Sequence, residues 1–162
     1  MATGPEQLYD DDFYAWTRRQ AAALRRLRLT RPNVELDLDH LVEEVADLGT
    51  NRRDALRSQL RRIIQHCLKL EHSPAQGPRP GWRDAIIDGR LEIEDQLSRS
   101  LRRDLGRNLP KLYGQARRAA ADSLRAYGED AAADTLPETC PYALPDLLRH
   151  GWHPTSRHGL RP

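Results

Sequence analysis

The sequence predicts an all-α protein, a single-domain bundle of five or six helices that includes an antiparallel helical hairpin. Apolar residues recur every three or four positions along most of the chain, as they do on the buried face of an amphipathic helix. No useful length of chain alternates apolar and polar residues as a half-buried strand does. The stretch 35–70 changes from acidic to basic around Gly49, which favours two helices folded back on each other.

The first predicted helix opens at the acidic run of Asp10, Asp11 and Asp12, which suits an N-cap and a first helical turn. Its core-facing stripe then follows at helical spacing, arginines fill the other face, and a connector over 30–35 ends it. The stripe consists of Phe13, Trp16, Gln20, Ala23, Leu24 and Leu27.

The predicted hairpin comes next. Its first helix begins at Asp37 and stops at Gly49, and its second begins after Thr50 or Asn51 and continues to Leu70. Residues 35–47 contain six acids and no Lys or Arg, whereas residues 51–70 contain six bases and one acid. The two stripes are Leu38, Leu41, Val42, Val45 and Leu48, then Leu56, Leu60, Ile63, Ile64, Cys67 and Leu68.

Two long helices and a short one are predicted after a linker over 72–81 that is rich in Pro and Gly. One starts near Trp82. The next is capped by Ser100 and ends before Gly128, with a kink or a break expected at Pro110. A short helix starts near Pro145. The side chains expected to be buried are Trp16, Leu41, Val45, Leu60, Ile64, Trp82, Ile86 and Leu112.

The 162 residues suit one domain, which we place at 9–152, with flexible termini at 1–8 and 153–162. No apolar run is long enough to span a membrane, and no signal peptide is recognisable. Two distant cysteines, Cys67 and Cys140, are typical of reduced thiols in a cytoplasmic protein. The net charge of +2 argues against a dedicated nucleic-acid binder, which carries a strong basic excess.

An ordered set of short segments resembles a bacterial family known as domain of unknown function 29. It includes Tyr9 with Phe13 and Trp16, then 41–45 with Leu48 and Gly49, and His66 to Lys69. It continues with Trp82, Arg83, Ile86, Arg90 and Ile93, then Tyr113 and Ala116, and closes with 140–142 and 147–148. Leu70 departs from the pattern, where an aromatic residue is common. The resemblance covers roughly residues 9–152; it implies a small helical protein and no established activity.

A partly buried polar cluster of Glu44, Arg53 and Arg90 is the leading candidate site. Arg90 falls inside the apolar stripe of its helix, so its charge needs an acceptor. The predicted hairpin sets Glu44 level with Arg53, and we expect Glu44 to pair with Arg90, with Glu94 as the local alternative. A structural ion network is favoured over a ligand-binding or catalytic site.

Metal and cofactor sites are not expected. Glu44 and His66 would lie about 18 Å apart along the hairpin, too far for one metal ion. Arg61 and His66 match the Arg-x4–6-His motif of the helical HEPN ribonucleases, but several such matches are expected by chance. These two side chains also point about 140° apart on a helix, whereas a shared site needs convergence.

The sequence therefore favours a non-enzymatic interaction module that forms a homo-oligomer or binds another bacterial protein. The alternative is a HEPN-like ribonuclease with Arg61 and His66, or a nucleic-acid-associated helical protein, since arginines line two predicted helices.

Overall fold

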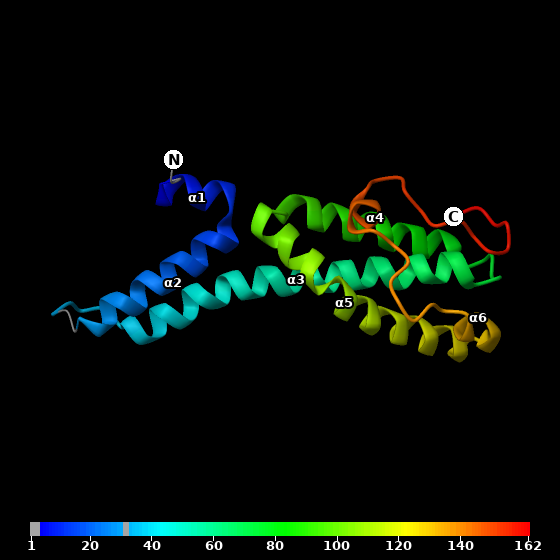
Figure 1. Cartoon of the computed structure of the whole chain (residues 1–162), viewed down its shortest axis with the longest axis horizontal. Coiled ribbons are helices and arrows are strands. Elements are labelled where there is room, and N and C mark those ends of the chain that lie inside the picture. Colours follow the sequence, from blue (N-terminus) through cyan, green and yellow to red (C-terminus); the bar gives the residue numbers. More distant parts are fainter. Residues whose placement is uncertain (1–3, 31–32) are drawn as a thin grey trace. The chain divides into compact units, whose positions relative to one another are not determined.

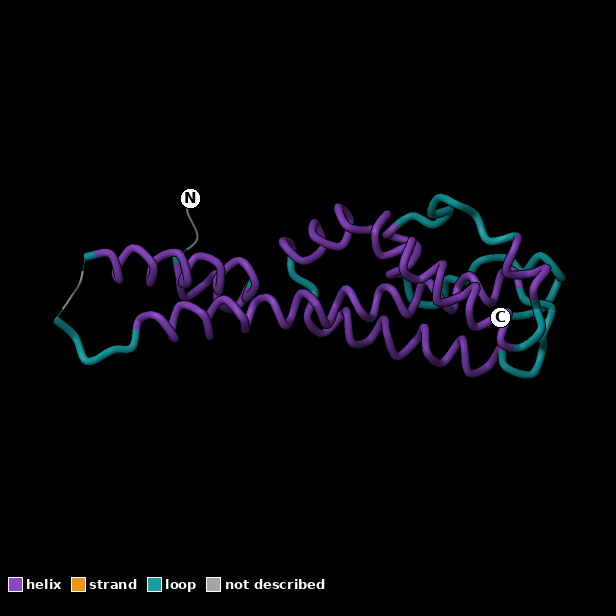
Figure 2. Tube along the Cα trace, turned by 90° about the horizontal axis from the view of Figure 1, so that it is seen from below, coloured by secondary structure: helices purple, strands orange, loops and turns teal. Residues whose placement is uncertain are grey.

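The computed structural model describes residues 4–30 and 33–162, and within them the prediction of an all-α fold is confirmed. Figure 1 shows the order of the helices, and Figure 2 shows that loops make up the rest of the described chain. None of these helices combines the length and the apolar character that crossing a membrane requires. The described residues form seven helices: α1 (Pro5–Asp11), α2 (Phe13–Leu29), α3 (Leu38–His72), α4 (Arg79–Gln96), α5 (Arg99–Ala126), α6 (Asp130–Asp134) and α7 (Leu144–Leu148).

The chain folds into two compact units. The first, called here the hairpin unit, comprises Met1–Ala55 and Leu97–Asp104; the second, the core unit, comprises Leu56–Gln96 and Leu105–Pro162. Both α3 and α5 contribute residues to each unit. The single domain expected over 9–152 stays a prediction, since units that share continuous helices can still unfold in one step.

An antiparallel hairpin is present, but α2 and the first half of α3 form it. The two helices run side by side in opposite directions (Figures 1 and 2). At one end Arg28 Nη1 lies 2.6 Å from Asp39 Oδ1. At the other end the guanidinium of Arg52 lies 4.2 Å from the centre of the Phe13 ring.

The predicted hairpin with its turn at Gly49 is wrong, because 37–48 and 51–70 belong to the single helix α3. Gly49 is buried against α2, where an added Cβ would clash with Thr17 Oγ1. The glycine therefore permits close approach of two helices and does not end one. The different partner also explains why Leu41, expected to be buried, is 37% exposed, and why Trp16 and Val45 are only half-buried.

Asp12 caps two helices of the hairpin unit at once. It is the N-cap of α2, where its Oδ1 accepts a hydrogen bond from Ala15 N at 3.0 Å. Its carboxylate also accepts from Ser100 N at 2.9 Å and from the hydroxyls of Ser98 and Ser100, at the start of α5. Burial raises the pKa of Asp12, but these hydrogen bonds outweigh it and leave the pKa below its usual value. The predicted helix thus opens within the acidic run, but only Asp12 caps α2, while Asp10 and Asp11 belong to the end of α1.

The core unit contains the most completely buried apolar side chains. The second half of α3, with α4 and α5, supplies Leu60, Ile63, Ile64, Ile86, Ile93 and Leu105, each no more than 1% exposed. Four predicted core residues are confirmed as buried here, Leu60, Ile64, Ile86 and Leu112. Trp82 is half-buried, with Lys69 Nζ 5.4 Å from its ring centre.

The helix α5 runs through Pro110 without the break that the sequence suggests. Proline cannot donate to the carbonyl of residue i−4, which is Gly106 here. Gly106 is exposed, so solvent can reach the carbonyl that the proline leaves free. The short α7 lies where it was predicted, whereas α1 and α6 were not predicted.

The two ends of the chain are more ordered than the expected flexible termini. Residues 5–8, expected to be flexible, belong to α1, and residues 1–3 lie outside the described residues. In the C-terminal segment 153–162, Ser156 is buried and Arg157 N donates to Glu71 O at 2.9 Å. Arg79 Nε donates to Arg161 O at 2.6 Å, so the last residues are tied to α4.

Replacing Gly49 by alanine should destabilise the protein by about 1 to 3 kcal/mol, although alanine is the better helix former. The new methyl group would meet the buried, β-branched Thr17, which cannot move aside easily. The free energy of unfolding in urea measures the loss.

Gly114→Ala is the matched control, since Gly114 lies within α5 and an added Cβ would meet nothing within 4 Å. It should stabilise the protein by up to about 1 kcal/mol. Equal effects of the two substitutions would contradict a close-approach role for Gly49.

Candidate functional site

Arg90 is buried, as predicted, but it binds backbone carbonyls. Its side chain on α4 is 2% exposed in the core unit. Nε donates to Leu147 O at 2.8 Å and Nη2 donates to Trp152 O at 2.8 Å. Burial lowers the pKa of Arg90 from its usual value. The guanidinium thus fixes α7 and the following loop to α4, which is a structural role.

The predicted cluster of Glu44, Arg53 and Arg90 is wrong in its geometry. Glu44 is exposed, and it shares the continuous helix α3 with Arg53, nine residues apart. Residues at that spacing lie about 13 Å apart along a helix, so the two are not level. Arg53 Nε donates to its neighbour Asp54 at 2.8 Å. The local alternative partner of Arg90, Glu94, is exposed and lies 2.9 Å from His150 Nε2.

The structure does not bring Arg61 and His66 together. Both lie on the α3 portion of the core unit, where five residues of helix direct them about 140° apart. Arg61 is exposed and His66 is half-buried. Burial, followed by the charges of Lys69 and Arg62, lowers the pKa of His66 to about 4. The imidazole is therefore neutral at pH 7.

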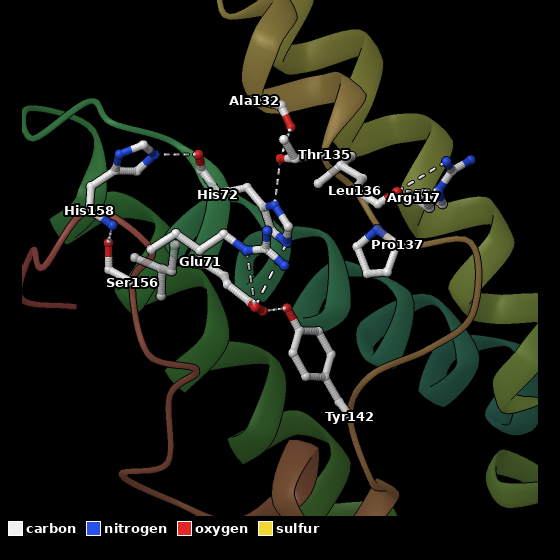
Figure 3. A network of polar contacts seen from close by, with 12 residues as sticks. Glu71, His72, Arg117, Ala132, Thr135, Leu136, Pro137, Tyr142, Ser156 and His158 are labelled. Atoms are coloured by element: carbon white, nitrogen blue, oxygen red, sulfur yellow. Dashed lines mark hydrogen bonds and ion pairs between the residues drawn. The ribbon is translucent and has the colours of Figure 1, made fainter.

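A polar network that the sequence did not indicate lies at the C-terminal end of α3 (Figure 3). Tyr142 Oη donates to Glu71 Oε2 at 2.6 Å, and Arg157 Nε lies 3.7 Å from Glu71 Oε1. The neighbouring His72 is buried and contacts Thr135, 2.8 Å from its Nδ1. These residues come from α3, the 135–142 loop and the C-terminal segment, so the network joins parts of the core unit that are distant in sequence.

The hydrogen bonds define the tautomer of His72. Thr135 Oγ1 donates to Ala132 O at 2.8 Å, so the same oxygen accepts from His72 Nδ1. Nε2 then carries the lone pair and has no hydrogen-bond partner among the described residues, with Glu71 Oε1 3.8 Å away. Burial lowers the pKa of His72 more than Glu71 raises it, so the ring is neutral at pH 7.

A pocket of about 360 Å³ adjoins this network, lined in part by His72, Glu129, Thr135, Arg157 and His158. His158 Nε2 lies 3.0 Å from His72 O, and the ring of His72 is engaged with Thr135. The polar groups around the pocket therefore hold loops to the end of α3.

The two thiols are poor nucleophiles. Burial raises the pKa of Cys67 to about 12. Burial also raises the pKa of Cys140, whose sulfur lies 3.4 Å from Tyr142 O. The thiolate is the reactive form, so neither residue is activated at pH 7. Within residues 4–30 and 33–162 no group of three or more His, Cys, Asp or Glu side chains could hold a metal ion.

The hairpin unit carries an apolar surface, called here the hairpin face. Buried Tyr14, Thr17 and Ala21 mark the side of α2 that packs on α3. Counting about 100° per residue, Leu27 lies roughly a quarter turn from that side. The hairpin face comprises Gln20, Leu24 and Leu27 of α2 and Leu41, Val45 and Leu48 of α3.

The exposed apolar side chains of α2 and of α3 lie on the same face of the hairpin. On α3 the buried side carries Leu38, Val42 and Gly49, and Leu41 and Leu48 lie about a quarter turn away in the same rotational sense as Leu27 on α2. Because α2 and α3 are antiparallel, side chains that are displaced in the same rotational sense from the contact lie on the same face of the hairpin. Leu48 is 52% exposed there. At the same end of the hairpin as Leu48, Tyr9 of α1 packs edge-on against Phe13 and Trp16, with ring centres 5.4 and 4.9 Å apart.

The two helices of the hairpin carry opposite charges. Residues 13–29 include five arginines and no acid, and residues 38–47 include four acids and no Lys or Arg. On the side of α2 that faces away from α3, Arg19 lies about one turn before Ala23 and Arg26 about one turn after it. Glu44 occupies the outer edge of α3 and is exposed.

Comparison with known proteins places the chain in a family. The profile of the family described as domain of unknown function DUF29 matches residues 8–153. The chain belongs to this family. The resemblance predicted from short segments is thereby confirmed, and the DUF29 family description assigns no activity.

A solved structure has the same fold as this DUF29 protein. It is the crystal structure of an alpha-helical protein of unknown function from Rhodospirillum rubrum, with a TM-score of 0.78 and 22% sequence identity. The alignment covers 89% of this chain and 90% of that chain. At this identity the likeness establishes the helical fold. No curated protein matches the chain.

Sequence reasoning found the burial of Arg90 and missed the Glu71–His72–Tyr142 network. The apolar stripe around Arg90 predicted its burial, but no residue type or spacing indicates which backbone carbonyls accept its hydrogen bonds. His72 and Tyr142 lie 70 positions apart in loops and helix ends, where periodicity gives no signal.

Arg90→Met should cost about 2 to 4 kcal/mol of stability, because two carbonyls would lose their charged donors while the apolar stem is kept. In urea unfolding, the change in the free energy of unfolding of the double variant with Glu44→Gln should equal the sum of the two single changes. This follows because Arg90 binds carbonyls and does not pair with Glu44. Arg149→Met is the control, because Arg149 is exposed and pairs with Asp146 at the surface; it should cost less than about 1 kcal/mol. A coupling between positions 44 and 90 would contradict this assignment.

Acidification should destabilise the protein through His66. Its pKa is about 4 in the folded chain and 6.5 ordinarily, so the unfolded chain binds more protons between these values. Stability is then complete above pH 6.5 and falls by on the order of 2 kcal/mol as the pH drops to 4. Urea midpoints at pH 7 and pH 5 should differ less in His66→Gln than in the wild type. His150→Gln, at an exposed position, should keep the wild-type difference.

Proposed function

We propose that this DUF29 protein is a non-enzymatic protein-interaction module that binds its partner through the hairpin face. The observation that carries the proposal is the distribution of exposed apolar side chains. Of the ten large ones among the described residues, seven belong to the hairpin unit and three to the core unit. The seven are Tyr9, Leu27, Leu29, Val34, Leu36, Leu41 and Leu48, and three of them, Leu27, Leu41 and Leu48, belong to the hairpin face.

An exposed apolar surface of this kind supports binding to another protein. A hairpin of two helices buries only the side chains between them, so a stripe wider than that contact needs a further layer. Gathered apolar patches on soluble proteins mark interaction sites more often than scattered leucines do. Helical faces with leucines one or two turns apart are a common docking surface for other helices.

The chemistry of the core unit favours a structural role over catalysis. Both thiols have raised pKa values, His66 and His72 are neutral, and Arg61 points away from His66. A HEPN-like ribonuclease would need Arg61 and His66 to meet at one phosphate. The exposed arginines of α2 leave nucleic-acid association as the alternative, which predicts an affinity that falls steeply with salt. We also propose a cytoplasmic location, supported by the two free thiols.

Leu41→Asp should abolish binding of the partner with little change in stability, because Leu41 is exposed in the isolated chain. A charge buried at an interface costs on the order of 100-fold in affinity. Affinity capture from the native bacterium, quantified for wild type and variant, measures this loss. Leu91→Asp on α4 is the matched control, since Leu91 is 50% exposed outside the hairpin face.

Two results would contradict the proposal. One is a set of captured proteins that is the same for wild type and Leu41→Asp, together with unchanged self-association. The other is cleavage of RNA by the wild type that His66→Ala abolishes, because the protein would then be an enzyme.

A further inference from the structure

We propose that the C-terminal segment 153–162, called here the strap, is acid-sensitive and leaves the end of α3 when His72 takes up a proton. The proposal concerns the core unit and does not depend on the hairpin face. It is carried by the contacts that hold the strap and by the polar groups that surround His72 (Figure 3).

The strap completes the C-terminal end of α3. Arg157 N donates to Glu71 O at 2.9 Å, and His158 Nε2 lies 3.0 Å from His72 O. The last carbonyls of a helix have no partner within the helix, so they need donors from elsewhere. Two of these donors come from the strap, about 86 positions away in the sequence.

The strap buries little apolar surface. Within it Ser156 is buried and the single leucine, Leu160, is only half-buried. Arg79 of α4 donates to Arg161 O at 2.6 Å and, at the end of α3, to Leu70 O at 2.9 Å. A segment held by a few hydrogen bonds, with little apolar burial, can open locally while the rest of the fold stays intact.

The ring of His72 has no acceptor in place for a second proton. Its side chain is fully buried, and Nδ1 already donates to Thr135. Proton uptake would add an N–H at Nε2, where Glu71 Oε1 lies 3.8 Å away, beyond the length of a hydrogen bond. Arg157 Nε lies 3.7 Å from the same oxygen, and Tyr142 donates to the other oxygen of Glu71. A protonated His72 would therefore compete with Arg157 for one carboxylate oxygen.

The groups around His72 favour its neutral form while the strap is in place. Glu71 of α3 lies beside the ring, Glu129 lines the adjoining pocket, and the strap contributes Arg157 and His158. Burial lowers the pKa of His72, Glu71 raises it by less, and Arg157 and His158 lower it further. Two of the three causes that lower the pKa thus belong to the strap.

The strap therefore has a pH-dependent equilibrium between a closed and a lifted form. Lifting it takes Arg157 and His158 away from the ring and admits water, so the pKa of His72 rises towards its ordinary value of 6.5. The lifted form then binds a proton more tightly than the closed form, and proton uptake shifts the equilibrium towards it. The shift begins as the pH falls through 6.5 and amounts to at most about tenfold for each further pH unit.

Lifting the strap also alters the pocket of about 360 Å³ at the end of α3. Arg157 and His158 form part of its wall, whereas His72, Glu129 and Thr135 stay with the rest of the core unit. Acid therefore opens the pocket on the side of the strap and brings His72 to a surface that solvent can reach.

Hydrogen exchange on the whole chain from pH 7 to pH 5 tests the strap. The amide of Arg157 is the reporter, because it donates to Glu71 O only in the closed form. Its protection, corrected for the effect of pH on the intrinsic exchange rate, should fall by up to about tenfold for each pH unit below 6.5. His72→Asn should remove this dependence, because an amide can still donate to Thr135 and does not titrate.

Two substitutions serve as controls. His66→Gln removes another buried histidine of the core unit, and His158→Gln removes the histidine of the strap that contacts His72 O. Both should keep the pH dependence of Arg157 protection, because a protonated His158 still donates to that carbonyl. Protection of Arg157 that is independent of pH in the wild type, or that falls equally in His72→Asn, would overturn the proposal.

Nitrogen NMR of the wild type gives a measurement that needs no substitution, so the test holds even if His72→Asn does not fold. A ring of His72 that becomes an imidazolium only after the Arg157 amide has lost its protection supports the strap. An imidazolium at His72 with Arg157 still fully protected would overturn it. Neither outcome bears on the hairpin face, which Leu41→Asp tests separately.

Discussion

The hairpin unit depends on the close packing of α2 against α3 at Gly49. Thr17 occupies the space that any larger residue at position 49 would fill, and Tyr14 also lies against the glycine. This contact sets both the separation and the rotation of the two helices. The rotation in turn decides which side chains are buried between them and which remain on the hairpin face. A surface that we assign to binding is therefore fixed by a residue that takes no part in it.

The core unit depends on hydrogen bonds that arginine side chains donate to backbone carbonyls in loops and at helix ends. Arg90 donates to Leu147 and Trp152, Arg79 donates to Leu70 and Arg161, and Arg117 donates to Leu136. Each of these guanidiniums fixes a loop or a helix end to a long helix. Arginine suits this task because its planar group offers several donors in fixed directions and never loses its charge. The loops after α5 thus have a definite path although they contain little regular structure.

The sequence predicted the fold class and much of the core because helical periodicity reports burial directly. It placed Leu60, Ile64, Ile86 and Leu112 in the core and Arg90 among them. The predicted turn at Gly49 was wrong. A glycine that ends a helix and a glycine that lets another helix approach closely cannot be told apart unless the segment that packs against it is known. The change from acidic to basic residues along α3 was real, but the acidic half lies beside the arginines of α2. The partner carbonyls of Arg90 and the links from Glu71 to Tyr142 join residues 57 to 71 positions apart, and no local pattern encodes them.

The double cap at Asp12 bears on the order in which the chain can fold during synthesis. Asp12 leaves the ribosome early, but the serines that it binds lie 86 and 88 positions later. Until they emerge, its carboxylate can cap α2 alone, for the roughly 4 to 17 s that translation of the intervening residues takes. A nascent chain paused between residues 55 and 98 would therefore carry a hairpin that lacks its last segment. The arrival of Ser98 and Ser100 completes the polar contacts of Asp12 and joins the start of α5 to the hairpin unit.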